Sequence, residues 1–392
     1  MTRSNRTTPS PAISERSLSG DICNDPSGSS HGGTSRAAVF TGADQPLEMQ
    51  EFPLPSLGPH EALVAIECST ICGSDLHTVK GLRQERCPSI LGHEAVGSIA
   101  AIGSPALTDI QGTALQIGDR VTWSTVVACG DCDRCQRGLP QKCRSVSKYG
   151  HDIAEGRTAL SGGLADYLLL RKGSAVVRID AEIQAEVICP ANCATATVAC
   201  AMRYADPIAG SRVLIIGAGM LGLTAAAMAK TKGAAQVTVV DTLPTRLTKA
   251  RRFGADHALL WDAVPEVFQR SLVEATGAAQ FDVLLEFSGS SSATSTLCQL
   301  CDVGGRVILV GTVMPSPPVN FDPEAVVRRC MSIRGVHNYA PQDLEAAIEF
   351  LYQAQHRYPF ADLVEKHFRL HDTEAAFAFA LEHRPIRTAI RP

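Results

Sequence analysis

The sequence of 392 residues has no long apolar run and no excess of charge of one sign. No stretch approaches the roughly 20 apolar residues that a membrane-spanning helix needs, so we predict no membrane partner. Lys and Arg number 36 and Asp and Glu number 40, which gives a formal net charge of −4. This balance does not favour nucleic acid or an anionic surface as a partner. The length suffices for two domains with ordinary cores.

The segment 1–36 lacks the apolar centre of a secretory signal. Its content of Ser, Thr, Gly, Pro and Arg predicts a disordered tail instead. A transit peptide is the alternative, although the segment contains acidic residues and no clear amphipathic helix. We therefore predict a cytoplasmic protein. The sequence contains 14 cysteines, and without a secretory signal clustered cysteines indicate metal binding rather than disulfides.

The pattern of apolar residues changes near residue 194. Before about residue 188, short apolar runs such as 62–66 and 97–102 are separated by Gly, Pro and Asp, which predicts a β-rich part. After it, strands expected at 212–216, 236–240, 281–287 and 306–310 alternate with helices such as 221–230. Such alternation predicts a parallel, doubly wound α/β sheet. We expect this domain, 194–337, to be inserted into a β-rich domain made of 37–193 and 338–392.

Four cysteines form the pattern Cys-x2-Cys-x2-Cys-x7-Cys, namely Cys129, Cys132, Cys135 and Cys143. Short loops of this kind can bring four sulfurs around one tetrahedral zinc ion. The intervening Gly130 and Gly138 permit tight turns. Four protein ligands leave no open position, so this site is predicted to be structural. An iron–sulfur site and cysteines without a common role are the alternatives.

A second group of candidate ligands lies in Cys72-Gly-Ser-Asp-Leu-His77 and Gly92-His93-Glu94. A catalytic zinc takes three protein ligands and leaves the fourth position to water or substrate. Cys72 and His93 are two candidates, and Cys193 lies where the β-rich part passes into the doubly wound part. A lone cysteine is usually a small buried hydrophobe, and we assign Cys68, Cys189 and Cys200 to that class.

Residues 213–222 combine an apolar strand with Gly-x-Gly-x-x-Gly and the start of an Ala-rich helix. In this pattern Gly217 allows a tight turn and Gly219 lets the backbone approach a pyrophosphate. Gly222 lets the helix and the strand pack closely, with the helix N-terminus facing the phosphates. The motif therefore predicts a dinucleotide site.

Asp241 ends the next predicted strand, 19 residues after Gly222. A carboxylate there can bind the ribose 2′-hydroxyl and would repel a 2′-phosphate, which favours NAD over NADP. Arg246 follows nearby, where it could touch the ribose or, less in keeping with Asp241, accommodate NADP.

Together these motifs resemble the zinc-containing medium-chain alcohol dehydrogenase family, which carries them in the same order. The resemblance extends over nearly all of 37–392. It implies a GroES-like β-rich catalytic domain, with the structural zinc lobe at 129–143, and an NAD-binding Rossmann domain. It also implies two Zn²⁺ ions per chain, a small-molecule alcohol or carbonyl substrate, and a homodimer or homotetramer.

The resemblance also implies a role for each matching residue. Cys72, His93 and Cys193 would be the catalytic zinc ligands. Asp75 would be the carboxylate that orients His93, and Glu94 would lie beside the metal.

The remaining roles concern the proton and the cofactor. Ser74 would hydrogen-bond the alcohol and His77 would end the proton relay. Thr197 and Val310 would line the nicotinamide site, and Arg387 would bind the pyrophosphate.

The implied activity is reversible oxidation of an alcohol to an aldehyde or ketone with hydride transfer to NAD. A narrower resemblance, to a branch proposed for phosphonate catabolism, rests on residues 148–151, 191–198 and 335–339. A phosphonate would need cationic or N–H groups. The sequence does not show whether any of the available basic residues reaches the cleft. These residues are Lys148, His151, His337 and Arg144.

Three other functions remain open from the sequence. A polyol or sugar-alcohol dehydrogenase of the same fold would have a hydroxyl-rich pocket. A zinc-free quinone or enoyl reductase would leave Cys72, His93 and Cys193 without a use. A catalytically silent, NAD-binding regulatory relative would be expected to have lost ligand or relay residues, and here all of them are present.

Overall fold

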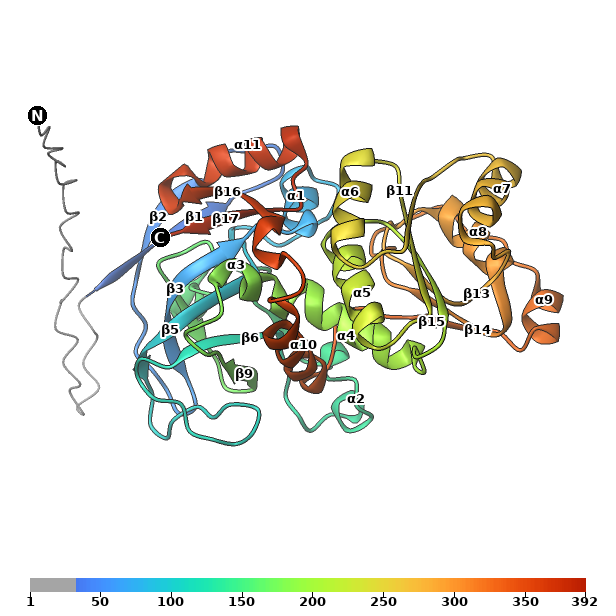
Figure 1. Cartoon of the computed structure of the whole chain (residues 1–392). Helices are drawn as coiled ribbons and strands as arrows, with labels where there is room; N and C mark the ends of the chain where they lie inside the picture. The colour runs from blue at the N-terminus through green and yellow to red at the C-terminus, as the bar shows by residue number, and fades with distance from the viewer. Residues whose placement is uncertain (1–32) are drawn as a thin grey trace, which may run out of the picture.

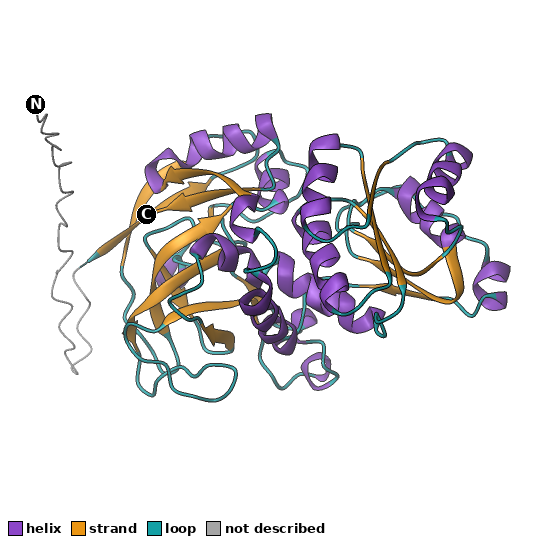
Figure 2. Ribbon diagram, in the orientation of Figure 1, coloured by secondary structure: helices purple, strands orange, loops and turns teal. Residues whose placement is uncertain are grey.

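A computed structural model describes residues 33–392 of the chain. Its strands form three sheets, and Figure 1 shows them in two halves connected by helices. One half is β-rich, and the other alternates strands with helices, as the colouring of Figure 2 makes visible. The predicted α/β fold, with a doubly wound part and a β-rich part, is confirmed.

The doubly wound half contains one six-stranded, all-parallel sheet. Its spatial order is β12 (His257–Leu260), β11 (Gln236–Asp241), β10 (Arg212–Ile216), β13 (Phe281–Glu286), β14 (Cys301–Leu309) and β15 (Ser332–Gly335). The chain runs outward from β10 to β12, then returns to β13 on the other side of β10. This reversal leaves a crevice at the carboxyl ends of β10 and β13, where doubly wound folds bind dinucleotides.

Helices cover both faces of this sheet because successive residues of each strand point to opposite sides. Val213 and Ile215 of β10 belong to the core shared with the helix that follows, whereas Leu214 packs into a separate core with Phe268. The helices of this half are α5 (Met220–Thr231), α6 (Pro244–Arg252), α7 (Pro265–Thr276), α8 (Ser291–Leu300) and α9 (Pro323–Arg328). In Figure 1, α5 and α6 face the β-rich half and α7 and α8 lie on the far side.

The β-rich half joins an early segment of the chain to the last one. Its larger sheet has the order β16 (Val364–Arg369), β17 (Arg387–Arg391), β3 (Ala62–Thr70), β5 (Glu94–Ile102), β6 (Arg120–Val127) and β7 (Ser147–Lys148), with β8 (Tyr167–Leu170) on β3 and β9 (Ser174–Arg178) on β6. The smaller sheet has the order β2 (Glu48–Pro53), β1 (Thr34–Phe40) and β4 (Ser89–Ile90). Short helices complete this half, namely α1 (Gly73–Val79), α2 (Asp133–Gln136), α3 (Ala185–Ile188) and α11 (Thr373–His383). Because β17 pairs with β3, the last strand lies beside the segment that carries the first candidate metal ligands.

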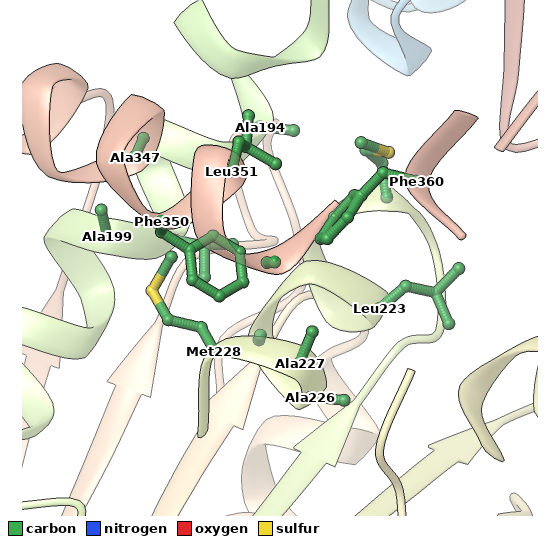
Figure 3. Packing of buried hydrophobic residues seen from close by; sticks show 14 of the residues in the cluster. Ala194, Ala199, Leu223, Ala226, Ala227, Met228, Ala347, Phe350, Leu351 and Phe360 are labelled. Carbon is green, nitrogen blue, oxygen red and sulfur yellow. The ribbon is translucent and has the colours of Figure 1, made fainter. Parts of the chain in front are cut away.

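Two helices, α4 (Ala194–Ala205) and α10 (Pro341–Ala354), connect the halves through one apolar core. Figure 3 shows Ala199 of α4 near Phe350 of α10 and Met228 of α5, and Ala194 of α4 beside Leu351 of α10. Small side chains on α4 and α5 let the helices approach closely, and the larger residues of α10 fill the space between them. The start of α4 is therefore held in a fixed position relative to the start of α5.

The predicted tail 1–36 ends earlier than expected. Residues 1–32 lie outside the described residues, but Thr34 to Arg36 belong to β1 and are paired with β2. Arg36 also forms a two-pronged ion pair with Asp166, with contacts of 2.8 and 3.0 Å. The Ser, Thr and Arg content of this segment resembles that of the preceding residues, so composition alone could not locate the first strand.

Within residues 33–392 no single helix is long and apolar enough to cross a bilayer. One bent pair, Ala185–Asn192 with Ala194–Ala205, has the required length and composition together, with an angle of 56° between its members. Both members are largely buried in the protein core.

Candidate metal centres and dinucleotide cleft

Candidate metal ligands from three distant segments meet at one place. Cys72 precedes α1, His93 and Glu94 stand where β5 begins, and Cys193 precedes α4. Their donor atoms all lie within 4.8 Å of one another. The structure thus brings together Cys72, His93 and Cys193, the three residues that the sequence analysis singled out. Two thiols and one imidazole leave a fourth tetrahedral position open, as in catalytic zinc sites.

A buried carboxylate orients His93. Asp75 Oδ1 lies 3.3 Å from His93 Nδ1, and both side chains are almost inaccessible to solvent. Asp75 Oδ2 accepts a hydrogen bond of 2.9 Å from the Cys72 backbone N–H, so Asp75 holds two candidate ligands at once. Burial opposes a charge on His93, but Asp75, followed by Cys72, raises the pKa of His93 well above its usual value. Because Nδ1 faces Asp75, Nε2 is the nitrogen left for a metal.

The turn before His93 requires a glycine. Gly92 has a φ of +85°, and a Cβ added there would lie 2.9 Å from Leu164 Cγ and 3.0 Å from Ser69 Oγ. No larger residue fits this backbone conformation without displacing its neighbours. The Gly-His pair of the motif therefore has a geometric reason, since the turn directs His93 into the cluster.

The loop that carries Cys193 is fixed by other segments of the chain. Asn192 Nδ2 donates a hydrogen bond of 2.9 Å to the carbonyl of Trp123, and the Asn192 carbonyl accepts one from the Tyr339 hydroxyl. Thr197 Oγ1 donates to the Cys193 carbonyl at 2.7 Å. Cys193 is thus held between β6 and the segment that leads into α10.

Glu94 and Arg387 form a buried ion pair beside the cluster. Arg387 Nε and Nη2 donate to the two Glu94 carboxylate oxygens at 2.7 and 2.8 Å, and Nη2 lies 3.7 Å from Cys72 Sγ. Thr70 Oγ1 donates to the same carboxylate at 2.7 Å. Glu94 therefore lies beside the candidate ligands. Arg387 is directed at Glu94 and Cys72, and its contact with a pyrophosphate stays a prediction.

The interaction between Cys72 and Cys193 shifts the pKa values of the two thiols in opposite directions. The hydrogen bond from Cys193, together with Arg387 and His93, lowers the pKa of Cys72 well below its usual value despite burial. The same interaction with Cys72, reinforced by burial, raises the pKa of Cys193. Zinc binds the thiolate form of cysteine, and the donor atoms of Cys72, His93 and Cys193 lie within 4.8 Å of one another, so the donor set fits a zinc ion.

Ser74 and His77, the residues predicted for proton transfer, lie on the same short helix. Ser74 Oγ is 3.4 Å from His93 Nε2 and is half-buried at the edge of the cluster. His77 lies three residues further along α1 and is exposed. One end of α1 therefore touches the cluster and the next turn reaches solvent.

The four cysteines of the 129–143 lobe converge on one point. Their sulfurs are separated by 3.4 Å (Cys129–Cys143), 3.5 Å (Cys132–Cys135), 3.9 Å (Cys132–Cys143) and 4.0 Å (Cys129–Cys135). Tetrahedral zinc with bonds of about 2.3 Å requires sulfurs about 3.8 Å apart. Gly130 and Gly138 have φ values of 83° and 75°, which supply the tight turns that the sequence predicted. The residues of the lobe thus fit a closed zinc site.

The three glycines of the dinucleotide motif have the geometry that the motif needs. Gly217 has a φ of 100°. A Cβ on Gly222 would lie 1.7 Å from the Gly217 carbonyl oxygen, so helix α5 can pack on β10 only without a side chain at this position. A Cβ on Gly219 would meet no atom within 4 Å, which leaves open space before the uncapped N-terminus of α5. A pyrophosphate fits such a space.

Asp241 ends the neighbouring strand β11, and Arg246 lies in helix α6, which follows it. Asp241 Oδ2 accepts a hydrogen bond of 2.6 Å from the Ala218 N–H, and Oδ1 accepts one of 2.9 Å from the Leu243 N–H. These bonds hold the carboxylate over the glycine turn. Arg246 is half-buried, and its Nε has no hydrogen-bond partner among the described residues.

A cavity of about 740 Å³ adjoins Val310, the residue predicted at the nicotinamide site. It lies between the end of β14, the segment after β15, and the four-cysteine lobe. Its lining includes Val310, Thr312 and Val336 on one side and Lys142 on the lobe. His337 also lines the cavity.

The sequence analysis did not identify the group that covers His93. His151 stacks on His93 with ring centroids 5.1 Å apart, and its Nδ1 lies 3.3 Å from Glu85. Burial lowers the pKa of His151. No spacing in the sequence links residue 85 to residue 151. His151 reaches His93 because Gly150, with a φ of 77°, lets the loop that carries His151 pack against the backbone of Gly92.

Both halves of the chain match known protein families. Residues 58–181 match the alcohol dehydrogenase GroES-like domain, and residues 221–353 match the zinc-binding dehydrogenase domain. The chain is 31% identical over 357 residues to L-threonine 3-dehydrogenase of Streptomyces avermitilis, which covers 89% of this chain and 97% of that protein. It is 29% identical over 344 residues to 5-exo-hydroxycamphor dehydrogenase of Pseudomonas putida, with 87% and 94% covered.

The fold is also that of a solved dehydrogenase. The structure of an alcohol dehydrogenase from Thermotoga maritima superposes with a TM-score of 0.85 at 26% identity, covering 92% of this chain and 100% of that one. The matched segments include Cys72, His93, the four-cysteine lobe and the end of the glycine motif. The chain therefore belongs to the zinc-containing medium-chain alcohol dehydrogenase family.

Proposed function

We propose that this member of the zinc-dependent dehydrogenases oxidises an alcohol reversibly to an aldehyde or ketone, with NAD as hydride acceptor. The observation that supports it best is the convergence of Cys72, His93 and Cys193 within 4.8 Å. This set leaves one tetrahedral position for a substrate oxygen. The same core that fixes Cys193 at the start of α4 also fixes the dinucleotide turn at the start of α5.

In this proposal Cys72, His93 Nε2 and Cys193 hold a catalytic zinc ion, and the 129–143 lobe holds a second, structural one. The catalytic ion would supply Lewis-acid chemistry that lowers the pKa of an alcohol hydroxyl. The chain's own contribution is to fix the three donors. Asp75 holds His93, and the buried pair of Glu94 and Arg387 places charge beside the ligands.

Proton removal is assigned to α1. Ser74 Oγ, at the edge of the cluster, accepts the hydroxyl proton of the alcohol while it passes its own proton on toward His77. His77, exposed one turn further on, passes a proton to solvent. His93 and Asp75 are only 5% and 1% exposed, so bulk water has little access to the imidazole and to the carboxylate that orients it.

NAD is the preferred cofactor in this proposal because Asp241 lies at the turn where the adenosine ribose would sit. Its carboxylate would accept hydrogen bonds from the ribose and repel a 2′-phosphate. Arg246 favours NADP, because its Nε has no hydrogen-bond partner among the described residues and could contact a 2′-phosphate. Thr197 and Val310 would line the nicotinamide.

The alternatives differ in what they require of the site. A polyol dehydrogenase would require a hydroxyl-rich pocket, whereas the cavity combines apolar residues such as Val310 with basic residues and with two hydroxyl groups, those of Thr312 and Tyr204. A silent relative or a zinc-free reductase would leave the cluster without a use.

Three further expectations stay predictions. They are the division into one domain of 37–193 with 338–392 and another of 194–337, the homodimer or homotetramer, and the cytoplasmic location.

The test compares two single variants, one at a candidate ligand and one at a control cysteine outside both clusters. Zinc is counted by atomic emission, NADH binding is followed by fluorescence, and NADH formation is measured with a panel of alcohols. We expect two zinc ions per wild-type chain. Cys72→Ala should keep one zinc and NADH binding but lose turnover. Cys298→Ala, in α8 and outside both clusters, should retain both ions and activity. Full activity in Cys72→Ala, or a wild-type chain without a second zinc, would overturn the proposal.

A further inference from the structure

The contact with Asp75 fixes the ring of His93 at one corner only. Asp75 Oδ1 and His93 Nδ1 are 3.3 Å apart, just beyond the usual range of about 2.7–3.2 Å for a hydrogen bond between nitrogen and oxygen. Neither atom has another hydrogen-bond partner among residues 33–392. A single contact of this kind leaves the ring free to tilt about the line that joins the two atoms. A second contact would be required to keep Nε2 in one direction.

His151 supplies a second contact, on the face of the same ring. The ring centroids of His93 and His151 are 5.1 Å apart, and the ring planes are inclined by 30°. This geometry lies within the range of attractive aromatic pairs. A tilt of His93 about its contact with Asp75 would push one ring edge against His151 or open a gap between the rings. The two contacts therefore restrict different movements of His93.

His151 is itself held by three contacts. Its Nδ1 lies 3.3 Å from Glu85 Oε1, and its backbone N–H donates to the Lys148 carbonyl at 3.3 Å. The preceding residue, Gly150, packs so closely on the turn before His93 that a Cβ on it would lie 3.1 Å from His93 Cβ. The His151 ring consequently has little freedom to move away from His93.

Glu85 is fixed in turn by the loop that follows α1. Arg83 Nη2 donates to Glu85 Oε1 at 2.7 Å, and the Arg83 backbone N–H donates to the His77 carbonyl at 3.2 Å. These contacts run from α1, which begins after Cys72, through the loop to His151. The helix that follows one candidate ligand thus supports the residue that covers another.

The pair of His151 and Glu85 is more polar than a space-filling role requires. Their side chains are only 10% and 12% exposed. Burying an imidazole and a carboxylate costs free energy that an aliphatic side chain of similar volume would not cost. An aliphatic side chain would also cover His93, but it has no flat face to match the ring and no nitrogen for Glu85 to hold. The polar pair therefore favours a role in orienting His93 over a role in packing.

We propose that His151 is a positioning residue of the candidate catalytic metal site. It holds the plane of the His93 ring so that Nε2 is directed at the metal position, and Glu85 sets the plane of His151. This inference rests on the proposed function, because it assigns a role at the same site. It gives His93 a second support beside Asp75.

The test removes the ring of His151 and then restores a ring without nitrogens. Zinc affinity at the cluster is measured by competition with a chelator, and the visible spectrum of the cobalt(II)-substituted protein reports the ligand geometry. We expect His151→Leu to alter the cobalt spectrum and to lower zinc affinity about 2- to 12-fold, the range that an aromatic pair contributes. His151→Phe should recover most of both properties. The matched control is His383→Leu, because His383 also stacks on an aromatic ring, that of Phe379 at 4.5 Å, outside both clusters. It should equal wild type.

Turnover gives a further readout. With any alcohol that the wild type oxidises, His151→Leu should lower kcat and leave KM for NAD unchanged, because the dinucleotide turn is not altered. If His151→Leu does not fold, His151→Gln takes its place with the same expectation, since it also lacks a ring.

The outcomes separate this inference from the proposed function. Wild-type zinc affinity and cobalt spectrum in His151→Leu, or equal losses in His151→Leu and His151→Phe, overturn the inference and leave the dehydrogenase intact. If no alcohol reduces NAD but zinc affinity still depends on the ring at position 151, the proposed function fails and the positioning of His93 stands. A wild-type chain that binds zinc only in the 129–143 lobe overturns both.

Discussion

Asp75→Asn should weaken zinc binding at the Cys72, His93 and Cys193 cluster, although the side chain at position 75 keeps its size. Asp75 Oδ1 lies 3.3 Å from His93 Nδ1, and Oδ2 accepts the Cys72 N–H at 2.9 Å. Asparagine retains one acceptor for Cys72 but removes the negative charge from His93. Loss of such an outer contact typically lowers metal affinity 10- to 100-fold. We therefore expect a loss of roughly 1.4–2.7 kcal/mol in zinc binding at this site.

The assay is competition for zinc with a chelator of known affinity, followed by kcat/KM with the best alcohol. A matched control is Asp343→Asn, because Asp343 is equally buried and pairs with Arg203 at 2.7 and 2.9 Å outside both clusters. The control should lower thermal stability and leave zinc affinity unchanged. Wild-type zinc affinity in Asp75→Asn, or an equal loss in Asp343→Asn, would refute the assignment of Asp75.

Three further predictions concern the other parts of the site. Cys135→Ser should remove one zinc ion per chain and lower the melting temperature by about 5 °C or more, while NADH still binds; an unchanged melting temperature would argue against a structural role for the lobe. Asp241→Ser should shift the ratio of kcat/KM for NADP over NAD upward by at least about tenfold, measured with one alcohol, and no shift would mean that another residue selects the cofactor. Burial lowers the pKa of His337 to about 4 in the folded chain, below the usual 6.5, so the unfolded chain binds the extra proton first. Above pH 6.5 the ring is neutral in both states and costs the folded state nothing. As the pH falls from 6.5 toward 4, protonation of the unfolded chain lowers the free energy of unfolding. His337→Asn should flatten this part of the curve of melting temperature against pH, and curves of identical slope would contradict it.

Short-range patterns predicted much of the structure. The strand, glycine turn and helix of 212–231 were expected from periodicity and glycine spacing, and the observed strand β10 has the predicted ends. The four-cysteine lobe was likewise readable because all its ligands lie on one short segment. Cys68, Cys189 and Cys200 are buried, as their lack of a motif suggested. In each case the information lies within about 20 residues.

Features that depend on distant segments were not readable in the same way. Arg387 was assigned to the pyrophosphate, but only the pairing of β17 with β3 reveals its contact with Glu94. The stacking of His151 on His93 and the contact of Lys142 with His337 depend on how loops pack across the cleft. Composition also placed the first strand too late, since a polar strand differs from a polar tail only through its partner β2.

The two metal-binding clusters differ in how much of the chain must exist before they can form. The sulfurs of the lobe are supplied by residues at most 14 positions apart, so closing that loop costs little entropy. The other cluster needs Cys72 and Cys193, and the buried Glu94 beside it finds its counter-ion 293 residues later, in Arg387. Until that residue has been synthesised, burying the carboxylate of Glu94 is unfavourable. The lobe can therefore bind its metal on a growing chain, whereas the reactive cluster becomes complete only when the last strand is added.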